Sequence, residues 1–283
     1  MRILIVVTTH PLYGIRPQVA AALDALDTTG YDVGRIDIDD DGIDPALSHF
    51  DRLLQKHLRI PTLATDYDAV LSVEYDNVIP ADTIQRLAVV DADVAHGLYC
   101  NRRPPYLWLA NIETNWAQGI TFARNGPTVQ AAWGNVVQTQ GVGLGCTLIH
   151  RRVLDNVPFR REPGHPCADD WFFALDCVAA GYRLAHDCGC VVGHILEDGQ
   201  RIVWPAPDEP FYRIEGDVLT AKSIQTETGQ QEYVCITRLY VRAENAYYQP
   251  GDTIVLPDEK AGDLLASGSI AHKKPPVQNK EKK

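Results

Sequence analysis

The sequence predicts an α/β protein with a mostly parallel sheet, flanking helices and a small β-rich appendage. Short apolar runs alternate with segments of helical period over residues 2–99, which is typical of a parallel sheet whose strands are buried on both faces. Beyond residue 210 the apolar runs become short and alternating, and turn signals are frequent. We therefore expect an α/β domain over residues 1–205, a β-rich module over 210–270 and a disordered basic tail over 271–283.

Each predicted element has its own local signal. Apolar runs rich in Val, Ile and Leu predict strands, and the segments between them carry apolar residues at helical spacing. Pro17 and Pro80 each suit the first turn of a helix, because proline lacks the N–H that this position leaves unpaired. The predicted strands are 2–7, 33–38, 69–73 and 94–99, and the predicted helices are 17–26, 45–64 and 80–90.

The second half of the domain begins with a long irregular segment over residues 101–138, rich in Trp, Tyr, Asn and Pro. A segment of this length inside a compact domain is usually a functional loop. Regularity returns with a glycine-rich turn at 141–145 that enters a strand, and a helix is predicted from Asp169 to the glycine stop at Gly181.

Charge is distributed unevenly along the chain. The formal net charge is −11, and the last 13 residues hold five lysines and one glutamate, a net of +4, so the first 270 residues carry −15. A body this acidic repels polyanions, so we expect no extended nucleic-acid binding by it. No apolar run approaches the roughly 18 residues of a membrane span, and the first run is too short for a secretory signal, so we expect a cytoplasmic protein.

Two acidic residues follow the third predicted strand. Glu74 and Asp76 come directly after the apolar run 69–73. The carboxyl ends of parallel strands border the crevice where α/β proteins bind ligands, and two carboxylates there can hold a hard cation that grips a diphosphate. A divalent cation would also supply the local positive charge that an acidic protein needs for a diphosphate. The alternative is a solvated turn, because Asp-Asn ahead of a proline is a common loop composition.

Two later positions carry further titratable groups. Asp169 and Asp170 precede an amphipathic helix, where one of them suits an N-cap and the other is left free to act as a base. His194 follows a short apolar run, and a lone histidine there is more often a core or surface residue than a ligand.

These pieces occur in a defined order. The strand with its acid-x-Asp is followed by a Gly-x-Gly strand and Arg-Arg-Val-Leu, then by Asp-Asp-Trp-Phe-Phe, an Ala-Gly-Tyr helix end and Gly-His. Each piece is unspecific by itself, whereas the order and spacing together are fairly specific. The series resembles glycosyltransferases of the GT-A fold, family 2-like, over about residues 1–200.

The resemblance implies a role for each matching residue. The segment 73–80 is similar to the family's DxD motif, so Asp76 would coordinate the metal, and Glu74, which departs from the usual first aspartate, would reach the ribose or a metal-bound water. Asp170 would be the catalytic base, Asp169 a helper at the acceptor, and His194 would complete the metal site. The positions implied for nucleotide binding are Thr8, His10 and Asp39, with Arg59 toward the diphosphate.

The implied reaction uses a nucleotide-diphosphate sugar, UDP- or GDP-linked, with Mn²⁺ or Mg²⁺. Asp170 would take a proton from an acceptor hydroxyl that attacks the anomeric carbon from the opposite face, so the configuration there would invert. The acceptor class stays open between a glycan, a protein and a modified nucleotide. Trp108, Trp116 and Trp133 would shape its site, because aromatic faces stack on sugar rings, and plain packing is the alternative.

Other functions compete with this one. A nicotinamide-dependent Rossmann enzyme needs Gly-x-Gly-x-x-Gly after the first strand, and the turn 8–14 holds a single glycine. A sugar nucleotidyltransferase would carry a glycine-rich, Arg-containing loop at the same place, and this loop is also missing. A non-catalytic carbohydrate-binding or virion assembly protein that retains the fold is the alternative from another class, and the altered Glu74 is its main support.

The C-terminal module gives one more indication. Residues 248–257 and the apolar positions after them resemble small modules common in bacteriophage proteins. This implies a phage-encoded enzyme, acting in the host cytoplasm, that decorates a virion protein or nucleic acid. An ordinary accessory β-module is the alternative.

Overall fold

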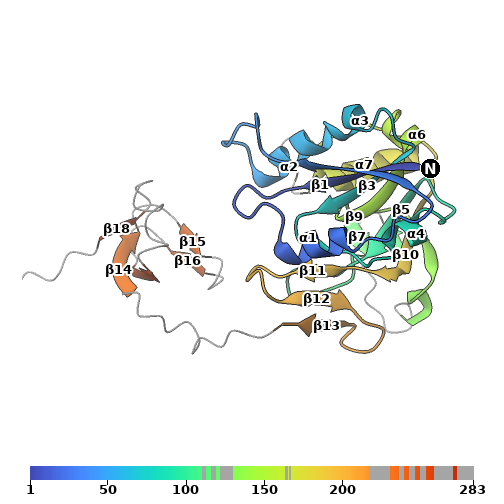
Figure 1. Ribbon diagram of the computed structural model, residues 1–283. Coiled ribbons are helices and arrows are strands. Elements are labelled where there is room, and N and C mark those ends of the chain that lie inside the picture. Colours follow the sequence, from blue (N-terminus) through green and yellow to red (C-terminus); the bar gives the residue numbers. More distant parts are fainter. Residues whose placement is uncertain are drawn as a thin grey trace, which may run out of the picture. The chain divides into compact units, whose positions relative to one another are not determined.

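The chain divides into two compact units, Met1–Asp217 and Val218–Lys283. Each is described by itself from a computed structural model (Figure 1). The described residues are 1–109, 113–115, 119–121, 130–162, 165, 167–216, 230–235, 239–241, 246–248, 253–257 and 270–272.

A seven-stranded sheet forms the centre of the first unit, in the order β2-β1-β3-β9-β5-β10-β8. Five strands run in one direction, and β8 and β9 run against them. The predicted α/β class with a mostly parallel sheet is therefore confirmed. The strands are β1 (Arg2–Thr8), β2 (Asp32–Ile38), β3 (Ala69–Glu74), β5 (Val94–Leu98), β8 (Val136–Thr139), β9 (Cys146–His150) and β10 (Leu184–Val191).

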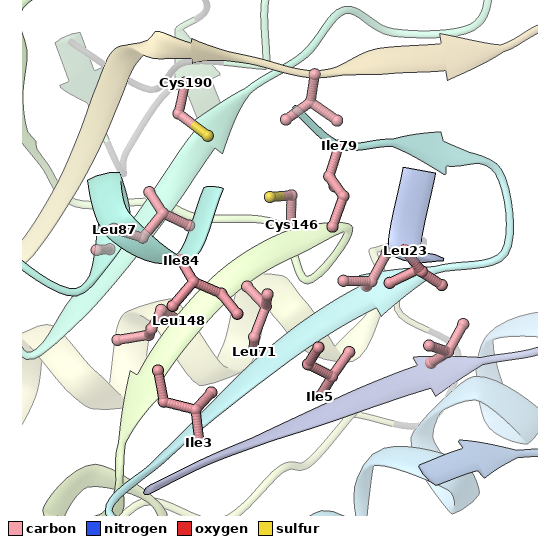
Figure 2. Close-up of a cluster of buried hydrophobic side chains, with 14 of the residues drawn as sticks. Ile3, Ile5, Leu23, Leu71, Ile79, Ile84, Leu87, Cys146, Leu148 and Cys190 are labelled. Atoms are coloured by element: carbon pink, nitrogen blue, oxygen red, sulfur yellow. The ribbon is translucent and has the colours of Figure 1, made fainter. Parts of the chain in front are cut away.

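Alternate residues of these strands feed two hydrophobic layers, one on each face of the sheet. Ile3 and Ile5 belong to the layer in Figure 2, whereas Leu4 and Val6 belong to the other. Helices α1 (Pro17–Asp24) and α4 (Thr83–Leu87) contribute to the first layer, and α3 (Ile60–Leu63), α6 (Arg151–Leu154) and α7 (Asp169–Ala179) to the second. The apolar runs read from the sequence are thus strands buried on both faces.

The helix predicted over 45–64 is broken into two. Helix α2 (His49–His57) begins at the N-cap Ser48, whose hydroxyl accepts from the Asp51 N–H, and α3 follows after a short turn. Pro61 explains the break, because it has no N–H to donate to the carbonyl four residues earlier and its ring crowds that carbonyl. The helix predicted over 80–90 is likewise shorter, since α4 spans Thr83–Leu87.

A second, smaller sheet joins distant parts of the first unit. Its order is β13-β12-β11-β4, and β4 pairs antiparallel with β11 so that Asn77 lies opposite His194. This pairing carries the histidine at the far end of the domain to the acidic segment after β3. The strands are β4 (Asn77–Val78), β11 (Gly193–Ile195), β12 (Ile202–Pro205) and β13 (Tyr212–Glu215).

The second unit contains short antiparallel strands, as predicted for a β-rich module. They are β14 (Gln230–Cys235), β15 (Leu239–Val241), β16 (Ala246–Tyr248), β17 (Thr253–Pro257) and β18 (Ile270–His272), and the first unit adds the hairpin β6 (Glu113–Asn115) and β7 (Gly119–Thr121). The segment 258–268, for which the sequence predicts a short helix with a glycine stop, lies outside the described residues, as does the tail beyond 272. None of the described helices combines the length and the hydrophobicity needed to cross a bilayer.

Candidate functional site

A pocket opens at the carboxyl edge of β1, β2 and β3. The strand register aligns Thr8 at the end of β1 with Ile38 on one side and Glu74 on the other, so the three strands end level. Thr8 is buried, and its hydroxyl has no hydrogen-bond partner. The pocket is lined by Thr8, Thr9, Pro11, Asp40, His49, Arg52, Leu53, Lys56, Glu74, Tyr75 and Arg102. This is the edge where α/β sheets bind ligands.

Asp76 and His194 lie together beside this pocket. The Asp76 carbonyl accepts from the Ile195 N–H at 2.9 Å, so the β4–β11 pairing continues up to the acid. His194 Nε2 lies 3.6 Å from Asp76 Oδ2, which is too far for a hydrogen bond, and the side chains are 8% and 3% exposed. The two predicted metal ligands therefore face each other across a gap.

A backbone carbonyl orients the His194 ring. Its Nδ1 lies 2.8 Å from the carbonyl oxygen of Cys100. A carbonyl only accepts, so Nδ1 carries a proton, and Nε2 is the nitrogen that faces Asp76 and offers a lone pair there when the ring is neutral. This arrangement, with the outer ring nitrogen held by a backbone carbonyl, is the one that metal-binding histidines usually have.

These residues fit a divalent cation. Asp76 Oδ1 and His194 Nε2 are buried without a hydrogen-bond partner. Two ligands of one cation, each about 2.1 Å from it, lie about 3.0 Å apart at a right angle and about 4.2 Å apart when opposite, so one ion can span the 3.6 Å gap. Within the described part of the chain no group of three or more metal-ligating side chains occurs. Two protein ligands match Mg²⁺-type sites, which draw further ligands from water and substrate phosphates.

Arg102 provides the positive charge beside this pair. Its Nη1 donates to Asp76 Oδ2 at 2.5 Å and to the Tyr75 hydroxyl at 3.1 Å. Burial by itself raises the pKa of Asp76, but His194 and Arg102 outweigh it, so the pKa is lowered and the carboxylate is ionised. Asp76 therefore carries a full negative charge in a nearly closed site.

Helix α2 supplies two more cations to the pocket. Lys56 is 3% exposed, donates to the Thr9 carbonyl at 2.6 Å and contacts Asp40. Arg52, one turn earlier, lies 3.5 Å from Asp40. An i, i+4 pair of basic residues thus points at the pocket, where it can meet phosphate oxygens.

The second acidic cluster begins at α7. Asp169 is the first residue of the helix, and its Oδ2 lies 2.7 Å from His57 Nδ1, with both side chains 0% exposed. Burial lowers the pKa of His57, but the charge and hydrogen bond of Asp169 more than offset it, so the pKa of His57 is raised. A buried ion pair therefore ties α2 to α7.

Asp170 lies next to this pair and has a different environment. Burial, and then the charges of Asp169 and Glu74, raise its pKa to about 7, even though it accepts the Trp171 N–H at 2.7 Å. The pKa of Glu74 is also raised, by burial and by Asp76. A carboxylate with a pKa near neutrality is a favourable general base.

The predicted nucleotide-binding residues separate into two groups. Thr8 and Glu74 line the pocket, and His10 stacks on Tyr13 with ring centroids 4.6 Å apart and packs at a tilt against Tyr75 at 4.8 Å. Burial and the neighbouring His49 lower the pKa of His10 to about 4, so it is neutral at pH 7. In contrast, Asp39 is exposed and caps the Asp41 N–H, and Arg59 donates to the Asp41 carbonyl at 2.7 Å. Neither lines the pocket.

The tryptophans of the irregular segment also differ from one another. Trp108 is 1% exposed, donates to the Phe211 carbonyl at 2.6 Å and packs on Trp133 with centroids 5.6 Å apart. Packing therefore accounts for Trp108, and Trp116 lies outside the described residues.

The site also contains residues that the sequence analysis did not select. Arg52 and Lys56 had a visible signal, since they lie at i, i+4 on the helix for which Arg59 was chosen. Asp40 had one too, since it follows the second strand next to Asp39, whereas His57 and Arg102 had none, because their role depends on tertiary contacts.

No protein-family model matches the chain, and no curated protein matches it. Solved structures give remote likenesses. A197 from STIV matches with 15% identity and a TM-score of 0.47, over 78% of this chain and 97% of its own. TarS of S. aureus in complex with UDP-GlcNAc matches with 13% identity and a TM-score of 0.37, over 66% and 56%. The mannosyltransferase PcManGT of Pyrobaculum calidifontis, in complex with GDP-Man and Mn²⁺, matches with 16% identity and a TM-score of 0.40, over 67% and 56%.

The chain thus spans a little more than half the length of the TarS and mannosyltransferase structures. With TM-scores below 0.5, these likenesses do not assign a function.

Proposed function

We propose that the chain is a metal-dependent glycosyltransferase of the GT-A type that uses a nucleotide-diphosphate sugar. The observation that carries this proposal is the gap between Asp76 and His194, where a carboxylate oxygen and an imidazole nitrogen face each other beside a pocket lined by three basic side chains. Such a site suits a cation and a diphosphate together.

In this proposal Asp76 and His194 hold Mn²⁺ or Mg²⁺. The ion would neutralise charge that develops on the diphosphate leaving group. Lys56 and Arg52 bind phosphate oxygens from α2, and the pocket at Thr8 and Glu74 receives the nucleoside, with His10 behind the pocket residue Tyr75. Lys56 is held in place by the Thr9 carbonyl and Asp40, so little side-chain freedom is lost on binding.

Asp170 is the proposed base. It takes the proton of an acceptor hydroxyl as the oxygen forms its bond to the anomeric carbon, and the bond from that carbon to the diphosphate oxygen breaks with both electrons leaving on the phosphate. The configuration at the carbon inverts, because the base and the leaving group lie on opposite faces. A pKa of about 7 supports this role. Asp169 is buried on His57, so we assign it to positioning rather than to contact with the acceptor.

The proposal is tested by nucleotide release from UDP- and GDP-sugars in the presence of Mn²⁺. We expect the wild-type chain to hydrolyse or transfer one class of donor and Asp76→Asn to lose this activity. The matched control is Asp82→Asn, which removes an exposed carboxylate six residues along the chain. If no donor releases nucleotide, the non-catalytic carbohydrate-binding alternative gains. The phage origin and the cytoplasmic localisation stay predictions from the sequence.

A further inference from the structure

The Arg102 guanidinium lies on one of the two proposed metal ligands. Its Nη1 is 2.5 Å from Asp76 Oδ2, the same oxygen that faces His194 Nε2 at 3.6 Å. The same stretch of backbone also contacts the other ligand, because the Cys100 carbonyl, two residues earlier, accepts a hydrogen bond from His194. One short segment after β5 therefore touches both proposed ligands.

Arg102 differs from the other basic side chains of the pocket in its partner. Lys56 and Arg52 are held by Asp40, which lies after β2. Arg102 is held by Asp76 itself and by the Tyr75 hydroxyl. Its side chain is 36% exposed, so it can move, and its fork of N–H groups suits phosphate oxygens as well as a carboxylate.

A guanidinium and a divalent cation on one carboxylate repel each other. A cation about 2.1 Å from Asp76 would lie within a few ångströms of the Arg102 charge, in a site where little water screens it. Because of this repulsion, the Arg102 guanidinium and the metal compete for the Asp76 carboxylate. A diphosphate in the pocket removes the conflict, because it offers the guanidinium another anionic partner.

We propose that Arg102 is the resident counter-ion of Asp76, which keeps the metal weakly bound until a nucleoside diphosphate group enters the pocket and draws the guanidinium away. Metal and donor then bind with positive coupling, and the coupling passes through this one side chain. The inference rests on the proposed function, since it takes Asp76 and His194 as the metal ligands.

The test is Mn²⁺ binding without any sugar transfer, measured from the electron paramagnetic resonance signal of free Mn²⁺ with and without UDP or GDP. We expect Arg102→Gln to bind Mn²⁺ about ten-fold more tightly than wild type when no nucleotide is present, and to gain less from adding nucleotide. Arg103→Gln is the matched control, because Arg103 is 68% exposed and contacts Glu197 rather than Asp76, and its Mn²⁺ affinity should equal that of wild type.

A second variant keeps the test decisive if Arg102→Gln does not fold. Tyr75→Phe removes the other acceptor of Arg102, together with the Tyr75 hydrogen bond to Asp76, and keeps both charged side chains, so it should tighten Mn²⁺ binding a few-fold in the absence of nucleotide. Unchanged Mn²⁺ affinity in Arg102→Gln, or in Tyr75→Phe where Arg102→Gln does not fold, overturns the role of Arg102, provided that wild type binds Mn²⁺ with nucleotide and Asp76→Asn does not. If wild type binds no Mn²⁺ even with nucleotide, or Asp76→Asn binds it equally well, the proposed function itself fails.

Discussion

Among the described residues of the first unit there are two buried carboxylate–histidine pairs, and they are built differently. Asp169 and His57 are in direct contact at 2.7 Å, and both side chains are fully buried. Asp76 and His194 are 3.6 Å apart, and the histidine uses its other nitrogen to bond the Cys100 carbonyl. The first pair is closed, and the second is open.

The difference separates a structural pair from a binding pair. In the closed pair the two facing atoms satisfy each other, so their charge stabilises the contact between α2 and α7. In the open pair the backbone holds the imidazole at a distance that a cation can span. Each pair joins an aspartate to a histidine that lies far away in the sequence, and only the separation of the side chains shows which pair is available to a ligand.

The largest effect is expected next to the closed pair, at Asp170. Asp170→Asn removes the proposed base, so the transfer rate should fall by about 10²- to 10⁴-fold. Asp176→Asn, on the same helix, is the control, because Asp176 pairs with Arg160 at the surface and not with the pocket. Steady-state kinetics with the donor identified by nucleotide release measures both. A variant at Asp170 with the full transfer rate would exclude this residue as the base.

The closed pair itself should matter for stability. Asp169→Asn leaves the His57 imidazolium buried without its counter-charge, which typically costs about 3–5 kcal/mol. Chemical denaturation followed by tryptophan fluorescence measures the free energy of unfolding. If the free energy of unfolding falls by less than about 1 kcal/mol, the pair does not stabilise the contact between α2 and α7 as its geometry indicates.

The open pair, Asp76 and His194, should contribute little to stability and much to metal binding. His194→Asn removes one hydrogen bond to the Cys100 carbonyl, so the free energy of unfolding should fall by about 1 kcal/mol. Mn²⁺ affinity in the presence of nucleotide should fall at least ten-fold, because the imidazole ligand is lost. If the stability loss matches that of Asp169→Asn while metal binding is unchanged, the two pairs have been assigned the wrong way round.

Much of the scaffold was predictable from the sequence, since buried parallel strands are continuous apolar runs. The strands at 2–7, 33–38, 69–73 and 94–99 correspond to β1, β2, β3 and β5 within a residue or two. The position of Asp76 follows from β3, and the acid after a buried strand is a local signal. The proximity of His194 to it depends on the two-residue strand β4, which has no signal of its own.

The site residues that were not predicted depend on tertiary contacts. Arg59 was selected on the expectation of one helix over 45–64, on which it shares a face with Lys56. Pro61 ends that helix early, and Arg59 turns to the Asp41 carbonyl while Lys56 stays in the pocket. Arg102 lies at the start of a segment without a period, so nothing local indicates that it contacts Asp76.

The smallest effect concerns pH, and it should separate Asp170 from the closed pair beside it. The pKa of Asp170 is raised from 3.8 to about 7, and the base must be deprotonated, so kcat/KM should rise about ten-fold per pH unit below 7 and level off above it. The pKa of His57 is raised as well, so the stability from its pair is fully present below pH 6.5 and is lost as pH rises through the higher pKa of the folded state. The groups that bear on Asp170 are Asp169, Glu74, His57, Tyr99, Cys167 and the Trp171 N–H.

Activity and stability should therefore change in opposite directions as pH rises. A pH–rate profile of the wild-type chain measures the first, and the difference in unfolding free energy between wild type and Asp169→Asn at pH 6 and pH 9 measures the second. That difference should shrink at the higher pH, because a neutral His57 no longer gains from the aspartate charge. If kcat/KM instead rises and levels off near pH 4, Asp170 ionises like an ordinary surface carboxylate. Its burial next to Asp169 would then have no bearing on catalysis.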